Sequence, residues 1–288
     1  MEVEIPKKHN EDLLKKVAKE IHELGHSKIE GVLTPEEVKG YVEVAREITR
    51  KEQEKVDKGL RDKDVDFNLY QYSGNHFYNP TREYRQFDAL IGHPLVHGVL
   101  ENLFHTKAIL SQTELRNPAQ NLTDSYAFEW HRDGRQVTED PSWIITFWML
   151  NDVDMDSGPT EIIERTHRLS QVGYDEARKP AADADVKKVL AKAGDLVFMN
   201  ANLLHRGTLK TSSKDRWYFI PTYSPWYFKP SMDYTKVFTR KQFDALTDLQ
   251  KQTFGFTTVP PHDERKRVYT MRPWQDVVHE FQFMEDSE

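Results

Sequence analysis

The first third of the chain has the hydrophobic spacing of amphipathic helices. Between residues 10 and 25 apolar side chains recur every three or four positions, with Asn10 as the expected N-cap and Gly25 as the expected stop. A second helix is predicted to begin at the TPEE sequence of residues 34–37, which supplies a capping threonine, a first-turn proline and the glutamate of a capping box. The charge-dense stretch 50–66 then favours an exposed helix end and loop.

Residues 82–104 form a third helical region, which we expect to break near Gly92-His93-Pro94 because proline disfavours the helical conformation before it. After this region the pattern changes to short segments rich in β-branched and aromatic residues. The sequence WIITFWML is apolar on both alternating faces, which predicts a central strand covered on each side, as in a two-sheet sandwich. The predicted strands are 108–115, 125–131, 143–151, 161–164, 196–200 and 217–223.

These elements predict a single domain that is mainly β with flanking helices. We expect residues 1–105 to be a mainly helical N-terminal region, 106–225 to be the β core, and 226–288 to be a C-terminal extension. The 288 residues are enough to bury a sizeable core. In the extension, DALTDLQ and WQDVVHEF have helical spacing.

Composition excludes several kinds of chemistry. The chain has no cysteine, which excludes disulfides, thiolate nucleophiles and iron–sulfur clusters, so that any metal must be held by nitrogen and oxygen. A net charge of -7 argues against a partner that is a nucleic acid or an anionic membrane. Because the sequence also has no long apolar window, we expect a cytoplasmic protein.

A candidate metal site lies in FEWHRDGRQ, residues 128–136. If the strand continues to Asp133, the side chains of His131 and Asp133 point to the same face and converge. His205, which follows another strand-like segment, is the candidate third ligand. Two histidines and one carboxylate form a facial triad, which leaves metal positions open and suits non-haem Fe(II). Considered alone, an H-x-D pair is more often a surface or packing element.

Several segments resemble the phytanoyl-CoA dioxygenase-like (PhyH) branch of the Fe(II)/2-oxoglutarate-dependent oxygenases. The resemblance spans roughly residues 20 to 225 and rests on GVLTPEEV, HRD, MLNDVDMDSGPTEIIERTHR and AGDLVFMNANLLHRGTLKTSSKDRW. It implies a double-stranded β-helix, or jelly-roll (cupin-like), core. It also implies that His131, Asp133 and His205 bind Fe(II), and that 2-oxoglutarate and O2 are consumed with release of succinate as a substrate C–H bond is oxidised.

The resemblance also assigns two cosubstrate contacts. Arg216, eleven residues after His205, stands where the family binds the far carboxylate of 2-oxoglutarate, and Thr160 stands where a hydroxyl often contacts it. A planar guanidinium suits a carboxylate because it donates two parallel hydrogen bonds. The sequence departs from the family at ERTHR, residues 164–168, and at Lys210, where an asparagine is common. Those departures favour a structural role for His167.

The substrate is expected to be a small organic metabolite or natural product. In related halogenases a small residue replaces the aspartate, so Asp133 favours hydroxylation or another oxidation. The WYF sequence at 226–228 and the extension after it either cover the pocket or form a homodimer interface. Candidate substrate contacts are the aromatic and histidine residues expected near the metal or the pocket mouth, which are Tyr70, Tyr72, His76, Phe128 and Trp130.

Two other functions fit part of this pattern. A metal-dependent hydrolase could use the same two histidines and aspartate with zinc and an activated water. A non-catalytic jelly-roll binding protein could keep the fold without turnover. Arg216 separates the hydrolase from the oxygenase, because a hydrolase needs no dicarboxylate anchor at that spacing. The binding protein predicts loss of the triad, whereas every ligand type is present in the sequence.

Overall fold

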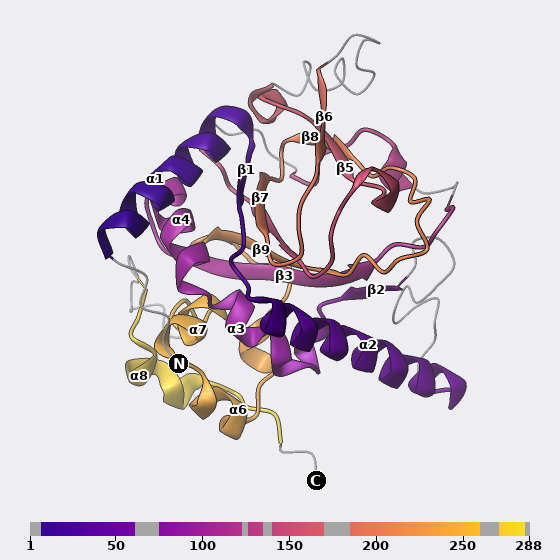
Figure 1. Cartoon of the computed structure of the whole chain (residues 1–288). Helices are drawn as coiled ribbons and strands as arrows, with labels where there is room; N and C mark the ends of the chain where they lie inside the picture. The colour runs from indigo at the N-terminus through magenta and orange to yellow at the C-terminus, as the bar shows by residue number, and fades with distance from the viewer. Residues whose placement is uncertain are drawn as a thin grey trace.

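The computed structural model describes residues 7–60, 75–122, 126–134, 140–169, 185–259 and 271–285 (Figure 1). Within these ranges the α-helices are α1 (Lys7–Leu24), α2 (Pro35–Asp57), α3 (Asp88–Ile91), α4 (Pro94–Phe104), α6 (Arg240–Ala245), α7 (Asp248–Thr253) and α8 (Trp274–Val277). Short 3-10 helices include those at Tyr126–Phe128, Met155–Ser157 and Thr166–Arg168. None of the described helices combines the length and apolar character needed to cross a membrane.

The strands form two antiparallel sheets. The larger has six strands in the order β1-β7-β4-β9-β3-β2, and the smaller has three in the order β6-β5-β8. Their bounds are β1 (His26–Ile29), β2 (Asn75–Tyr78), β3 (Ala108–Asn117), β4 (Ile144–Met149), β5 (Thr160–Ile163), β6 (Val186–Val189), β7 (Leu196–Asn200), β8 (Leu204–Arg206) and β9 (Tyr218–Pro225). The fold is therefore a mixture of helices and antiparallel sheets, and the closed jelly roll stays a prediction.

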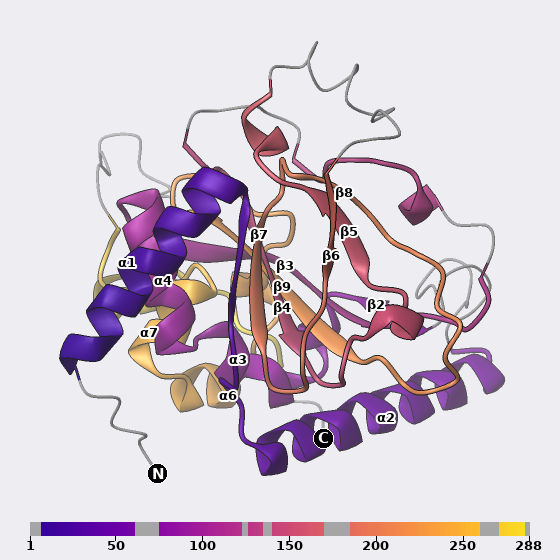
Figure 2. The same ribbon diagram turned by 45° about the horizontal axis from the view of Figure 1, so that its top comes forward.

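The larger sheet separates two apolar clusters. One face packs against the helices, with Trp148 and Phe219 among its fully buried side chains. The other face presents Ile145 and Ile220 toward Ile162 of the smaller sheet. Figure 2 shows this arrangement, with α1 and α4 on one side of the larger sheet and β5, β6 and β8 on the other. Burial of both faces explains why WIITFWML is apolar throughout, since β4 lies between β7 and β9.

The helical predictions are confirmed in part. Thr34 caps α2, and its side chain and that of Glu37 make both bonds of the capping box. Gly25 directly follows α1 with φ of 92°, a left-handed conformation that glycine adopts without strain. Asn10 is wrong as an N-cap, because α1 already begins at Lys7.

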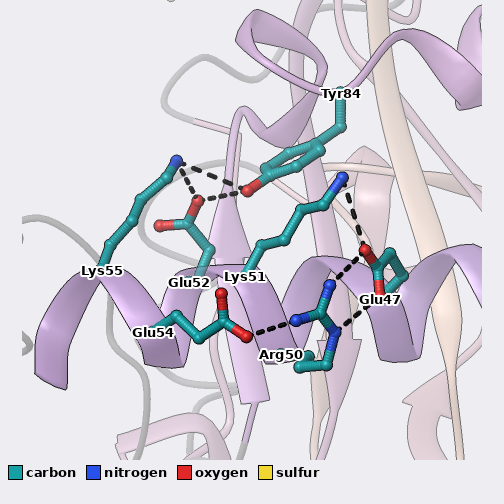
Figure 3. A network of polar contacts seen from close by, with 7 residues as sticks. All are labelled: Glu47, Arg50, Lys51, Glu52, Glu54, Lys55 and Tyr84. Carbon is teal, nitrogen blue, oxygen red and sulfur yellow. Dashed lines mark hydrogen bonds and ion pairs between the residues drawn. The ribbon is translucent and has the colours of Figure 1, made fainter.

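The C-terminal end of α2 is mostly exposed or half-buried, as predicted, but one of its acidic residues is an exception. Glu52 is fully buried, and its carboxylate accepts hydrogen bonds from Tyr84 Oη at 2.5 Å and from Lys55 Nζ at 2.7 Å (Figure 3). On the exposed side of the helix Arg50 bridges two other glutamates. The two hydrogen bonds to Oε1 help to offset the cost of burying this carboxylate. Residues 61–66 of the predicted exposed stretch lie outside the described residues.

Candidate metal centre

Three side chains converge at the edge between the two sheets. The backbone N–H of each histidine donates to the carbonyl of the other, at 2.9 Å from His131 and 3.0 Å from His205, which forms an isolated antiparallel bridge. The N–H of Asp133 donates to Ala201 O at 2.9 Å. These bonds bring Asp133 Oδ2 within 3.5 Å of His205 Nε2 and Asp133 Oδ1 within 3.9 Å of His131 Nε2. One potential ligand atom from each side chain lies within 4.8 Å of the other two.

Both imidazoles are oriented by their own backbone. His131 Nδ1 donates to Glu129 O at 2.7 Å, and His205 Nδ1 donates to Leu203 O at 2.9 Å. A proton held on Nδ1 leaves the lone pair of each Nε2 available to a metal. The two Nε2 atoms and the Asp133 carboxylate are therefore a nitrogen and oxygen donor set of the kind that binds non-haem iron.

The electrostatics keep the aspartate ionised. Burial alone would raise the pKa of Asp133, but the hydrogen bond to His205 and the charges of His205, His131 and Arg116 outweigh it and lower the pKa to about 2. For His205, burial acts to lower the pKa, and the hydrogen bond and charge of Asp133 reverse this into a net rise. Burial lowers the pKa of His131. An anionic carboxylate beside two imidazoles is the state that a divalent cation requires.

The segment that carries His131 is not the strand we expected. Residues Tyr126–Phe128 form a 3-10 turn, and only His131 makes a bridge. The chain then passes close to the segment after β7, so that a Cβ on Gly134 would lie 2.3 Å from Asn202 Oδ1. The two candidate ligands converge because backbone pairing with β8 and Ala201 holds their loop.

A cavity of about 720 Å³ extends from these ligands and is lined by both sheets. Its walls differ in character. One wall is polar and consists of the inward side chains of β3, which are Gln112, Glu114 and Arg116. The cavity-lining side chains of β4 and β9, which belong to the same sheet as β3, are mostly apolar and include Ile145, Phe147 and Ile220. The cavity is large enough for a small organic molecule.

The predicted cosubstrate residues lie on this cavity. Arg216 is 6% exposed, and its Nη1 donates to the carbonyls of Ser157 and Gly158. Its Nε is buried and has no hydrogen-bond partner among the described residues. Thr160, at the start of β5, also lines the cavity. A buried guanidinium with an unused N–H at a cavity wall fits an anionic ligand.

Sequence reasoning missed a charged network on the polar wall. Glu114 accepts a hydrogen bond from Arg116 Nε at 2.7 Å, and its carboxylate lies 2.7 Å from His76 Nε2. Burial would raise the pKa of Glu114, but Arg116 and His76 lower it. The alternation of polar residues along β3 was the available signal, since such side chains share one face.

The predicted substrate contacts are placed differently from one another. Phe128 lines the cavity, whereas His76 and Trp130 are buried and are not among its lining residues. The ring of Trp130 instead lies 4.7 Å from the guanidinium carbon of Arg206. Tyr70 and Tyr72 lie outside the described residues. His167, expected to be structural, is buried with Nε2 3.1 Å from His22 O.

The fold is similar to those of several solved oxygenases. The non-heme alpha ketoglutarate dependent carbocyclase SnoK from nogalamycin biosynthesis is 17% identical, with a TM-score of 0.59 over 75% of this chain and 85% of SnoK. The epimerase SnoN in complex with Fe3+, alpha ketoglutarate and nogalamycin RO is 15% identical, with a TM-score of 0.57 over 91% and 95% of the two chains. EctD from S. alaskensis with bound Fe is 17% identical, with a TM-score of 0.59 over 75% and 79%.

The family of the chain is shown by a family profile rather than by individual sequence relatives. No curated protein sequence matches the chain significantly. The profile of the phytanoyl-CoA dioxygenase (PhyH) family matches residues 21–217, which is well over half of the 288 residues. That match includes both candidate histidine ligands, the aspartate and Arg216. The chain belongs to the phytanoyl-CoA dioxygenase (PhyH) family.

Proposed function

We propose that the protein is an Fe(II)- and 2-oxoglutarate-dependent dioxygenase that hydroxylates an unactivated C–H bond of a small organic molecule. The observation that carries this proposal is the grouping of His131, Asp133 and His205 around one point at the end of a cavity. Membership of the PhyH family and the orphan Nε of buried Arg216 support it. When bound, the iron with 2-oxoglutarate and O2 supplies the oxidising chemistry, with decarboxylation of the keto acid to succinate.

The chain's own residues would act as follows. The Nε2 atoms of His131 and His205 and the carboxylate of Asp133 would hold the metal, each oriented before metal binding by the hydrogen bonds described above. Arg216 would bind the far carboxylate and so fix the keto acid at a set distance from the iron. Thr160 would add a hydroxyl contact to the same ligand. The apolar wall of β4 and β9 would limit water around the reacting carbon.

Hydroxylation is the outcome that we favour because Asp133 supplies a third ligand where related halogenases have a small residue. The same triad also supports rearrangements in the wider group, and the similar structures include a carbocyclase and an epimerase. We infer that the core is the double-stranded β-helix of this family, within a single domain over residues 1–288 that has a helical N-terminal region and a C-terminal extension.

The cavity favours a small substrate with polar groups, such as a metabolite or natural product. Gln112, Glu114, Arg116 and Thr222 present hydrogen-bonding atoms to the cavity along two neighbouring strands. A long alkyl chain would displace water from these groups without offering hydrogen bonds in return, which lowers affinity. The apolar side chains of β4 and β9 that also line the cavity suit the carbon skeleton that presents the C–H bond.

The test is an anaerobic titration of the Fe(II)-loaded protein with 2-oxoglutarate, followed by visible absorption. We expect the charge-transfer band of a keto acid bound through two oxygens, and O2-dependent release of succinate when candidate substrates are added. His205→Ala should lose iron and the band together. Absence of the band in iron-loaded wild type would refute the proposal. Zinc-dependent ester or amide hydrolysis would then favour a hydrolase, and ligand binding without turnover would favour a binding protein.

A further inference from the structure

Lys210 is a buried lysine at the wall of the same cavity. Only 6% of the residue is exposed, and it lines the cavity near Arg216. Among the described residues no carboxylate lies within ion-pair distance of its ammonium group, and no hydrogen bond to its side chain is formed. The neighbouring acid Asp215 is bound instead by Arg46 at 2.8 Å and by Asn117 at 3.1 Å. An ammonium group on a cavity wall, on a residue that is 6% exposed and has no contacting anion among the described residues, suits an anionic ligand.

The side chain of Arg216 and the backbone of Lys210 both contact the turn formed by Ser157 and Gly158. Arg216 Nη1 donates to the carbonyls of Ser157 and Gly158 in that turn. The backbone of Lys210 packs against the turn so closely that a Cβ on Gly158 would lie 2.9 Å from Lys210 N. Gly158 itself has φ of 71°, which favours glycine. The two cationic residues therefore lie beside the same turn on the cavity wall.

Without a ligand, the charge of Arg216 disfavours the charged form of Lys210. Burial lowers the pKa of Lys210, and the charge of Arg216 lowers it further against the opposite effect of Asp215. A carboxylate that enters this end of the cavity would compensate both groups. We propose that Lys210 is a second cationic contact for the far carboxylate of the keto acid, beside Arg216. This inference rests on the proposed function and makes Lys210 a determinant of cosubstrate specificity.

The experiment compares keto acids with and without the far carboxylate. Anaerobic Fe(II)-loaded protein is titrated with 2-oxoglutarate and with pyruvate, which has the keto acid group but no second carboxylate. In Lys210→Met we expect roughly tenfold to hundredfold weaker binding of 2-oxoglutarate, as for loss of one charge-assisted hydrogen bond. Pyruvate binding should change less than about twofold. Lys214→Met is the matched control, because Lys214 is an exposed lysine of the same loop and should leave both affinities unchanged.

The outcomes separate this inference from the proposed function. Unchanged 2-oxoglutarate affinity in folded Lys210→Met would overturn the role of Lys210 while leaving the oxygenase proposal intact. An equal loss for both keto acids would also overturn it, because the effect would then lie at the metal end. Absence of the band in wild type would overturn both proposals. Lys210→Asn, which removes the charge with a smaller side chain, gives the same test if the methionine variant does not fold.

Discussion

Replacement of Arg216 by alanine should weaken 2-oxoglutarate binding more than any other single change at the cosubstrate end of the cavity. The guanidinium is almost fully buried, stacks 4.8 Å from the centroid of the Tyr218 ring, and has an unused Nε donor. Loss of one partner of a buried, hydrogen-bonded charge pair costs about 2 to 5 kcal/mol. At 1.4 kcal/mol for each factor of ten, the dissociation constant should rise roughly 30-fold to several thousandfold.

The assay is the same anaerobic titration of the charge-transfer band, with iron affinity measured separately. Iron binding should be nearly unchanged, because Arg216 makes no contact with His131, Asp133 or His205. Arg216→Lys should bind 2-oxoglutarate with intermediate affinity, since lysine keeps the charge but cannot donate two parallel hydrogen bonds. Arg240→Ala removes an exposed arginine as the control. A dissociation constant within twofold of wild type in Arg216→Ala would contradict the assigned role.

Three further changes test the site and the fold. Asp133→Ala should lower Fe(II) affinity roughly tenfold or more in a metal titration, because it removes the anionic ligand between two imidazoles. Gly158→Ala should lower the melting temperature and weaken 2-oxoglutarate binding, because its Cβ would lie 2.6 Å from Thr208 O at positive φ; an unchanged Tm would refute this. Burial raises the pKa of Asp88 to about 6, against the opposing effect of Arg85, from an ordinary value of 3.8. The folded state therefore binds this proton more tightly, and up to about 3 kcal/mol of stability present below pH 4 is lost as pH rises through 6. In Asp88→Asn, the free energy of unfolding measured with urea should fall less between pH 4 and 7 than in wild type. The same pH dependence in both proteins would contradict the prediction.

Features that depend on neighbouring residues in the sequence could be predicted. The capping box at Thr34 and Glu37 uses bonds that close within one helical turn, so TPEE is sufficient to locate the start of α2. The central position of β4 follows from apolar residues on both of its faces. The break between α3 and α4 follows from Pro94, which begins the second of these helices.

Features that depend on distant pairing could not be predicted. Aromatic residues before His131 resemble a strand, but the structure has a 3-10 turn there, because the pairing partner is the three-residue strand that carries His205. The burial of Glu52 depends on Tyr84, which lies 32 residues away in sequence. The hydrogen bond between Glu114 and His76 joins β3 to β2 across 38 residues. In each case the neighbouring residues in sequence are compatible with more than one secondary structure or degree of burial.

The metal end and the cationic end of the cavity differ in how their charges are compensated before a ligand binds. At the metal end, backbone bonds hold His131, Asp133 and His205, and the aspartate already compensates an imidazole, so little reorganisation is needed when a cation arrives. At the other end, Arg216 and Lys210 are buried residues with no contacting carboxylate among the described residues, and the positive charge of Arg216 disfavours the charged form of Lys210. In the proposed oxygenase, binding of a dicarboxylate would relieve that repulsion and so add to the free energy of binding. A keto acid with only one carboxylate would gain the contacts of the first end and none of the second, so we expect the cationic end to select the cosubstrate.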